Sequence, residues 1–144
     1  MRIASVSDIH LDFARNRELF AKMAAQIHAC RADAVLVVGD VSHIDELIAR
    51  CILALKQVVD VVGYLPGNHD LWVNRPGEDL RDDRSFNTWN RHDHVLRALV
   101  ESAGGHYLPA KPLRLDDVAI AGSCGWYDYS FFRSDFRKEV TASA

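Results

Sequence analysis

The sequence predicts an α/β domain built on a parallel sheet, and three observations support this. Short apolar runs typical of buried strands occur at Ile3–Val6, Ala34–Val38 and Val61–Leu65. The segments between them are long enough to return through a helix, and such crossovers keep successive strands parallel. Each run is followed at once by polar residues. One sheet would therefore bring all three polar clusters to the same edge, where open parallel sheets bind ligands.

Helices are predicted in both crossovers. The first covers about residues 16–30, where apolar residues recur with helical spacing, and Asn16 is its expected N-cap. The second follows Ser42, with Asp45 three residues later in the manner of a capping box. One apolar stripe runs along it, made of Ile44, Leu47, Ile48, Cys51, Ile52 and Leu55.

The second half of the chain is more polar at first. We interpret residues 72–84 as a loop that shapes specificity, because Pro76-Gly77 and several charges lie within it. A third helix is predicted over about residues 85–103, ending at Gly104-Gly105. Short strands are predicted next at residues 107–108, Leu113–Leu115 and 118–121, with a turn at Asp116-Asp117.

Composition limits the function classes. A chain of 144 residues fits one domain, and 49% hydrophobic with 26% charged residues is typical of a soluble globular protein. The net charge of −3 gives no support for general nucleic-acid binding. Three cysteines without C-x-x-C spacing indicate neither a disulfide framework nor a zinc knuckle. With no signal-peptide core and no membrane-length apolar run, we expect a cytoplasmic protein with no membrane partner.

The polar clusters after the three strands carry the chemistry. In chain order they are Asp8-x-His10, Gly39-Asp40 and Gly67-Asn68-His69-Asp70. They offer carboxylate, amide and imidazole donors without thiolate, a set that suits Mn, Fe, Zn or Mg better than a soft metal. Because the sheet would bring them together, the sequence predicts the half-site of a metal-dependent hydrolase.

Taken in this order, the D-x-H, G-D and G-N-H-D motifs resemble those of the calcineurin-like metallophosphoesterase family. Residues 120–130, IAGSCGWYDYS, look like the strand and Trp-containing loop of bacterial members, so the resemblance covers essentially the whole chain. It implies a β-sandwich flanked by helices, in α-β-β-α layers. The chain, a single domain over residues 1–144, would supply the first sheet and the start of the second, an incomplete N-terminal portion of that fold.

The resemblance also implies a dinuclear metal centre. Asp8 and His10 would bind the first divalent ion, Asp40 would bridge both, and Asn68 would bind the second. A shared carboxylate holds two metals about 3.5–4 Å apart, where both grip one phosphate and activate water.

His69 would not be a ligand in this resemblance. It would contact the phosphate or protonate the leaving group, with Asp70 orienting its imidazole, which supplies acid catalysis near neutral pH. The implied activity is hydrolysis of a phosphomonoester or phosphodiester, with a phosphorylated small molecule or nucleotide as substrate.

One part of the family pattern is missing. Members carry a further His and a later G-H-x-H motif, but GHYL at residues 105–108 has Leu108 in place of the second His and is interpreted as a structural segment. The second metal would keep only Asp40 and Asn68, so we expect weak binding there. We expect the chain to be part of a longer enzyme. An uncovered sheet face predicts a homo-oligomer, a complementing chain or marginal stability.

Two other functions compete with an active enzyme. One is a non-catalytic subunit or remnant that binds a metal or phosphate, and the other is an interaction module that retains the fold. Taken singly, Asp8, Asp40 and Asn68 are also ordinary turn and helix-start residues.

Other polar residues have two interpretations each. His43 is a helix-start residue or a contact to metal or substrate, and Asp12 supports His10 or is solvated. His92 and His94 favour an exposed helix face over a metal site, and Cys124 favours a packed side chain over a nucleophile. Trp126 packs the core or, as the resemblance favours, walls the phosphate pocket.

Overall fold

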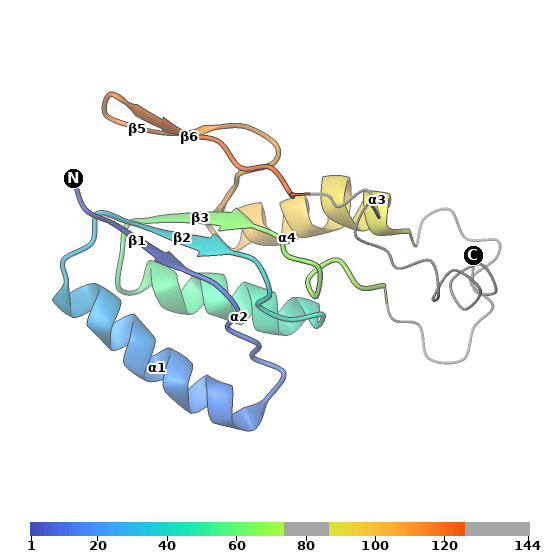
Figure 1. Ribbon diagram of the computed structural model, residues 1–144, viewed down its shortest axis with the longest axis horizontal. Helices are drawn as coiled ribbons and strands as arrows, with labels where there is room; N and C mark the ends of the chain where they lie inside the picture. The colour runs from blue at the N-terminus through green and yellow to red at the C-terminus, as the bar shows by residue number, and fades with distance from the viewer. Residues whose placement is uncertain (74–86, 126–144) are drawn as a thin grey trace, which may run out of the picture.

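The main feature of the computed structural model, which describes residues 1–73 and 87–125, is a parallel sheet of four strands (Figure 1). Its order is β1 (Ile3–Val6), β2 (Ala34–Val38), β3 (Val61–Leu65) and β4 (His106–Tyr107), and every neighbouring pair is parallel. Val6 pairs with Val37, and Val38 with Leu65, so the first three strands end at one edge. The predicted α/β class and the first three strands are confirmed.

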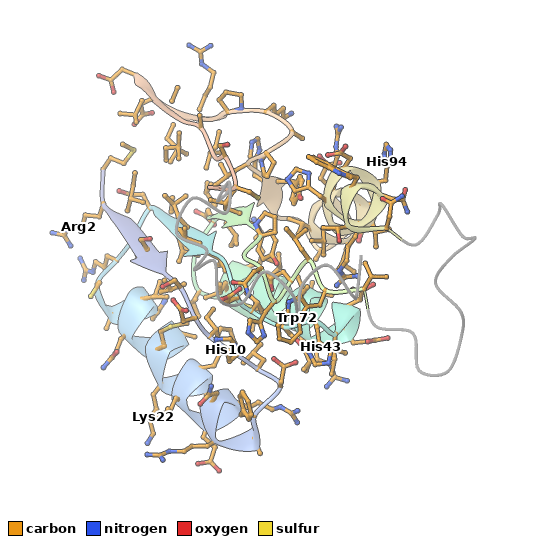
Figure 2. All side chains as sticks on the ribbon, turned by 45° about the vertical axis from the view of Figure 1, so that its right-hand side comes forward. Arg2, His10, Lys22, His43, Trp72 and His94 are labelled. Carbon is orange, nitrogen blue, oxygen red and sulfur yellow. The ribbon has the colours of Figure 1, made fainter. Side chains whose placement is uncertain are left out.

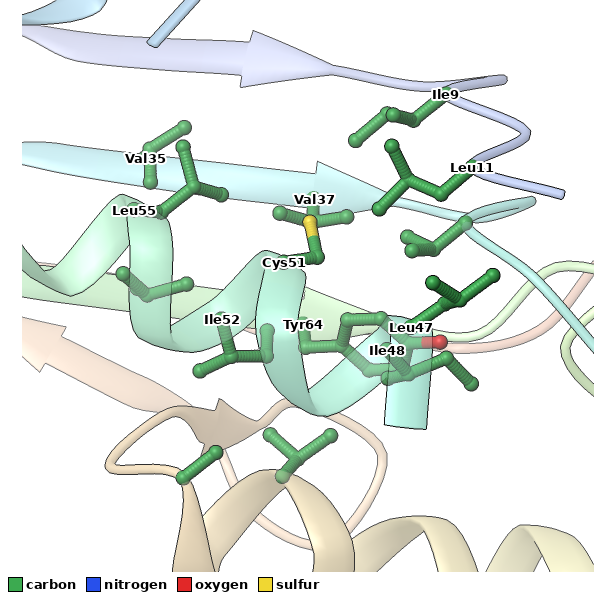
Figure 3. Packing of buried hydrophobic residues seen from close by; sticks show 14 of the residues in the cluster. Ile9, Leu11, Val35, Val37, Leu47, Ile48, Cys51, Ile52, Leu55 and Tyr64 are labelled. Atoms are coloured by element: carbon green, nitrogen blue, oxygen red, sulfur yellow. The ribbon is translucent and has the colours of Figure 1, made fainter. Parts of the chain in front are cut away.

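Helices cover one face of this sheet. In Figure 1, α1 (Ala14–Ala29) and α2 (Asp45–Lys56) both lie on the same side of β1 and β2, and α4 (Leu96–Ser102) packs against α2. Figure 3 shows Leu55 and Cys51 of α2 reaching toward Val35 and Val37 of β2. Fully buried side chains form this core, among them Val35, Val37, Ile48, Cys51, Ile52, Leu55, Val62 and Tyr64.

The first helix begins slightly earlier than predicted. Its N-cap is Phe13, with no side-chain cap, so Asn16 lies within the first turn and the predicted cap is wrong. The Asn16 amide instead donates hydrogen bonds to the backbone carbonyls of Ile9 and His10, at 3.2 and 3.1 Å. Asn16 therefore braces the loop that follows β1.

The second helix also starts without the predicted cap. Its N-cap is Ile44, and the Ser42 hydroxyl accepts a hydrogen bond from the Ile44 N–H at 2.9 Å. Ser42 lies two residues before the N-cap, so it orders the approach to the helix instead of capping it. Asp45 and Glu46 still occupy the first turn, where they favour the positive end of the helix.

The third helical segment contains a π-helical turn. It runs through α3 (Thr88–Asn90), the π-turn Arg91–Val95 and α4, and it ends as predicted near Gly104, whose φ of 82° suits glycine. Residues 85 and 86, where the prediction began, lie outside the described residues. In the described ranges, no helix combines the length and the apolar character that crossing a membrane requires.

A small antiparallel sheet lies on the other face. The strands β5 (Leu113–Leu115) and β6 (Val118–Ile120) are joined by a turn at Asp116, and Figure 1 shows them on the side away from α1 and α2. A Cβ at Gly63 of β3 would lie 2.8 Å from Leu36 Cδ2 and 3.5 Å from Leu113 Cδ2. The hairpin therefore packs closely on β3 and begins a second layer. His106 belongs to β4, which agrees with its interpretation as a structural residue.

Candidate metal centre

The loops after β1 and β2 are fastened together in a strained conformation. Asp8, His10 and Asp40 all have left-handed φ values, of 54°, 45° and 55°. Such values are uncommon outside glycine and cluster at functional sites. The Asp8 N–H donates to the Gly39 carbonyl at 3.2 Å, and the His10 N–H donates to the Asp40 carbonyl at 2.9 Å. Two predicted ligands are thus tied to the loop that carries a third.

Glycines allow the loop after β3 to join them. A Cβ at Gly67 would collide with the Asp40 carboxylate and backbone, and a Cβ at Gly39 would lie 2.9 Å from Gly67 Cα. The His69 N–H can therefore reach Asp40 Oδ1, to which it donates at 2.9 Å. The same bond directs the Asp40 carboxylate.

Asp70 joins the second and third loops. Its side chain is fully buried, and each oxygen accepts two backbone hydrogen bonds. The N–H groups of Asp40 and Gly67 donate to Oδ2, both at 2.8 Å. Those of Val41 and Ser42 donate to Oδ1, at 2.8 and 2.9 Å. This differs from the role that the resemblance implied, because the carboxylate secures loop backbone and not the His69 imidazole.

Opposing effects act on the charge of Asp70. Burial raises the pKa of this carboxyl group above its ordinary value, while the hydrogen bonds from the backbone lower it. The ionised carboxylate is the form that accepts hydrogen bonds at both oxygens. The loop arrangement is therefore built around an ionised Asp70.

Three side chains converge at this edge with donors suited to a metal. Single donor atoms of His10, Asp40 and His69 all lie within 4.8 Å of one another, and the two imidazole rings meet edge to face at 4.6 Å. His10 Nδ1 is buried and has no hydrogen-bond partner in the described ranges. A buried polar nitrogen without a partner is costly, and a divalent cation would satisfy it. The residues present fit a metal ion.

The other predicted site residues lie around this cluster. Asp8 and Asn68 are solvent-exposed on the loops after β1 and β3, and Asp8 does not belong to the converging group of His, Cys, Asp and Glu side chains. His69, predicted as an acid and not as a ligand, does contribute to it. Sequence reasoning placed the donors at the correct edge but could not resolve how their side chains turn.

The Trp72 side chain packs on the His69 ring. The sequence had placed Trp72 only at the start of a loop. The Trp72 indole lies 3.9 Å from the His69 ring at 31° between planes, and 6.3 Å from the His43 ring. Figure 2 labels His10, Trp72 and His43 in the same region, past the arrowhead of β1. The His69 imidazole is thus held between Trp72 and the His10 ring.

Asp12 and His43 form a supporting pair. His43 Nδ1 lies 3.1 Å from Asp12 Oδ1, which also accepts a 2.6 Å hydrogen bond from the Ser42 hydroxyl. Asp12 therefore connects the first loop to the start of α2 and does not support His10 directly. The sequence left both roles open.

Arg91 is a positioning residue that the sequence did not single out. Its Nε donates to the Asp70 backbone carbonyl at 2.6 Å, and its Nη2 lies 2.8 Å from Asp45 Oδ1. The side chain is only 12% exposed. It joins the π-helical turn, the loop after β3 and the start of α2. No local pattern around Arg91 signals this role.

The remaining candidates lie elsewhere. His92 Nδ1 contacts Asp93 at 2.6 Å and His94 is exposed, in agreement with a helix surface. Cys124 Sγ lies 3.5 Å from the Pro66 carbonyl, and burial raises the pKa of its thiol, in agreement with an unreactive side chain. Trp126 and the charged part of the 72–84 loop lie outside the described residues.

Comparisons with known proteins point to one family. The model of the calcineurin-like phosphoesterase family matches residues 1–133. Among solved structures, phosphopantetheinyl hydrolase from Mycobacterium tuberculosis is 21% identical, with a TM-score of 0.71 over 99% of this chain and 52% of that one. This chain thus spans about half the length of that neighbour, whose likeness shows the fold. No curated protein sequence matches.

Proposed function

The chain belongs to the calcineurin-like phosphoesterase family, and on that premise we propose that it hydrolyses a phosphomonoester or phosphodiester with metal-activated water. The observation that carries the proposal is the convergence of His10, Asp40 and His69 donor atoms within 4.8 Å, with His10 Nδ1 unpartnered in the described part of the chain. The solved neighbour, a phosphopantetheinyl hydrolase, has the same fold.

The family uses divalent metals, and two are proposed here. His10, Asp8 and Asp40 would hold one ion, and Asp40 with Asn68 would hold the other, more weakly. The chemistry that bound divalent ions supply is Lewis-acid polarisation of the phosphoryl oxygens and activation of water. Mn, Fe, Zn and Mg all suit oxygen and imidazole donors.

The chain's own groups then position the substrate and move a proton. The His69 imidazole, held between Trp72 and His10, would protonate the leaving oxygen, which is efficient for imidazole near neutral pH. Asp70 acts indirectly by keeping the loops joined, so that the backbone N–H of His69 keeps its hydrogen bond to Asp40 Oδ1. The substrate proposed is a phosphorylated small molecule or nucleotide.

The test is Mn²⁺-dependent hydrolysis of p-nitrophenyl phosphate and bis-p-nitrophenyl phosphate by the purified chain. Asp40→Ala and His69→Ala should each abolish turnover. His94→Ala, which removes an exposed imidazole outside the cluster, should leave it unchanged. Turnover that survives Asp40→Ala would contradict the proposal.

A metal- or phosphate-binding subunit without turnover is the second candidate. It is favoured because the His, Cys, Asp and Glu donors that converge in the described ranges are those of His10, Asp40 and His69, fewer than two complete metal shells require. Calorimetric titration with Mn²⁺ separates the cases. Binding that Asp40→Ala removes, without hydrolysis of either ester, would support this subunit, and absence of metal binding would favour an interaction module.

A further inference from the structure

A cavity of about 790 Å³ opens directly beside the candidate metal centre. Its walls come from the ends of β2 and β3, the loop that carries Asn68 and Trp72, the start of α3 and the loop after β6. Cavities of this size hold small organic molecules. Because Asn68 and Gly67 belong both to the G-N-H-D loop and to the wall, the cavity begins where the phosphate of a substrate would lie.

The described part of the wall carries no charge. None of the described lining residues has an ionisable acidic or basic side chain at neutral pH, and apolar side chains such as Val38, Leu65 and Trp72 dominate. A charged group entering the cavity would lose water without gaining an opposite charge, which is costly. A neutral apolar group would instead gain from burial.

Trp72 gives the cavity a planar wall. It is 46% exposed although it is among the largest apolar side chains, and it lines the cavity while also stacking on His69. Its indole therefore packs on His69 and still has exposed surface. Aromatic rings favour offset stacking with planar partners, so this surface suits a flat organic group.

We propose that this cavity is the subsite for the organic part of the phosphoester, and that it takes an uncharged, largely apolar, planar group against Trp72. The proposal rests on the proposed function for the position of the phosphate, and it names the class of ester. Esters whose organic part is itself a phosphate chain or a carboxylate would be poor ligands.

The first experiment measures binding in place of turnover. Methylphosphonate, benzylphosphonate and 2-naphthylmethylphosphonate, whose C–P bonds resist hydrolysis, are titrated calorimetrically into the chain with Mn²⁺. The naphthyl compound should bind at least about tenfold more tightly than the methyl compound, because it buries more apolar surface. The readout is the ratio of these two affinities within one variant, which cancels effects transmitted through His69.

Substitutions show which side chain gives the naphthyl compound its higher affinity. Trp72→Ala should bring the ratio close to one, and Trp72→Phe should restore most of it. Trp89→Ala is the matched control, since Trp89 is exposed and does not line this cavity, and it should keep the natural ratio. A natural ratio near one, no binding of the naphthyl compound, or a ratio unchanged by Trp72→Ala would overturn the proposal.

A charge exchange tests the second half of the proposal. 4-Carboxybenzylphosphonate should bind at least about tenfold more weakly than benzylphosphonate, because its carboxylate meets no cationic side chain among the described lining residues. Thr88→Lys, at an exposed lining position, should narrow that difference. Equal affinities in the natural chain would overturn the selection against charge.

Failure of the subsite is distinguishable from failure of the proposed function. If methylphosphonate binds equally without Mn²⁺ and in Asp40→Asn, the metal centre is refuted. The naphthyl-to-methyl ratio still reports on the cavity in that case.

Discussion

The helix-covered face of the sheet and its carboxyl edge are built in opposite ways. The face is filled by fully buried apolar side chains of β2, β3 and α2, and no residue of these three elements has a positive φ. At the edge, Asp8, His10 and Asp40 have left-handed backbone conformations. Glycines stand there where a Cβ would collide with neighbouring atoms, and a buried carboxylate accepts hydrogen bonds from backbone N–H groups. The difference teaches that the face is stabilised by apolar burial, whereas the edge is held by polar contacts and tolerates backbone strain that brings polar donors together.

The largest loss of stability is expected on removal of the buried Asp70 carboxylate, which holds the loops of the edge together. Asp70→Ala should lower the free energy of unfolding by about 3–5 kcal/mol, because two buried and two partly buried hydrogen bonds from backbone N–H groups lose their acceptor. Urea denaturation measures this, with Asp60→Ala as the exposed acidic control. A loss below about 1 kcal/mol would mean that water replaces the carboxylate.

Substitutions in the helix-covered face should lower stability without changing metal affinity at the edge. Ile52→Ala should cost about 2–5 kcal/mol through lost burial and a residual cavity. The neighbouring Leu53→Ala, with Leu53 51% exposed, should cost about 0.5 kcal/mol or less. Denaturant titration gives both values, and Mn²⁺ affinity measured by calorimetry should stay within about threefold in both variants. A large change in metal affinity in Ile52→Ala would show that face and edge are coupled.

A smaller loss of stability with a larger loss of metal affinity is expected at the glycine contact. Gly67→Ala places a Cβ against the Asp40 carboxylate, so the loops must separate, at about 1–3 kcal/mol. Mn²⁺ affinity, measured by calorimetry, should fall at least about tenfold. Gly125→Ala is the control, because a Cβ there meets no described residue within 4 Å. Equal metal affinity in the two variants would separate the close approach from metal binding.

The smallest effect is expected at the clamp from the π-helical turn. Arg91→Met keeps the apolar stem but removes the bonds to the Asp70 carbonyl and to Asp45, and it should cost about 1–2 kcal/mol, because Asp45 is partly exposed. Arg97→Met, which removes only a surface pair with Glu101, should cost about 0.5 kcal/mol or less. Thermal unfolding measures the loss of stability in both variants. Equal losses would show that the contacts of Arg91 add no more stability than a surface ion pair.

The same contrast explains what the sequence could predict. The strands and the helical stripe of α2 were predictable because apolar runs and 3.6-residue spacing are local signals. The arrival of the D-x-H, G-D and G-N-H-D clusters at one edge followed from parallel topology alone.

The side-chain assignments at the edge were not local. Asn16 and Ser42 have the residue types of helix caps, but loop carbonyls and Asp12 engage them instead. Asp70 receives N–H groups from residues 28–30 positions earlier in the chain, and Arg91 reaches the loop from another helical segment. Such contacts exist only once the layers have packed, so residue type and spacing could not reveal them.

The central claim is that the strained edge exists to hold a metal, and metal-linked stability tests it most directly. Thermal unfolding of the natural chain and of Asp40→Asn is followed over increasing Mn²⁺, with Asp60→Asn as the control. At free Mn²⁺ of about 100 Kd, the natural chain and the control should gain about 2.7 kcal/mol, and Asp40→Asn should gain almost nothing. Equal gains in all three, or no gain in the natural chain, would contradict the account.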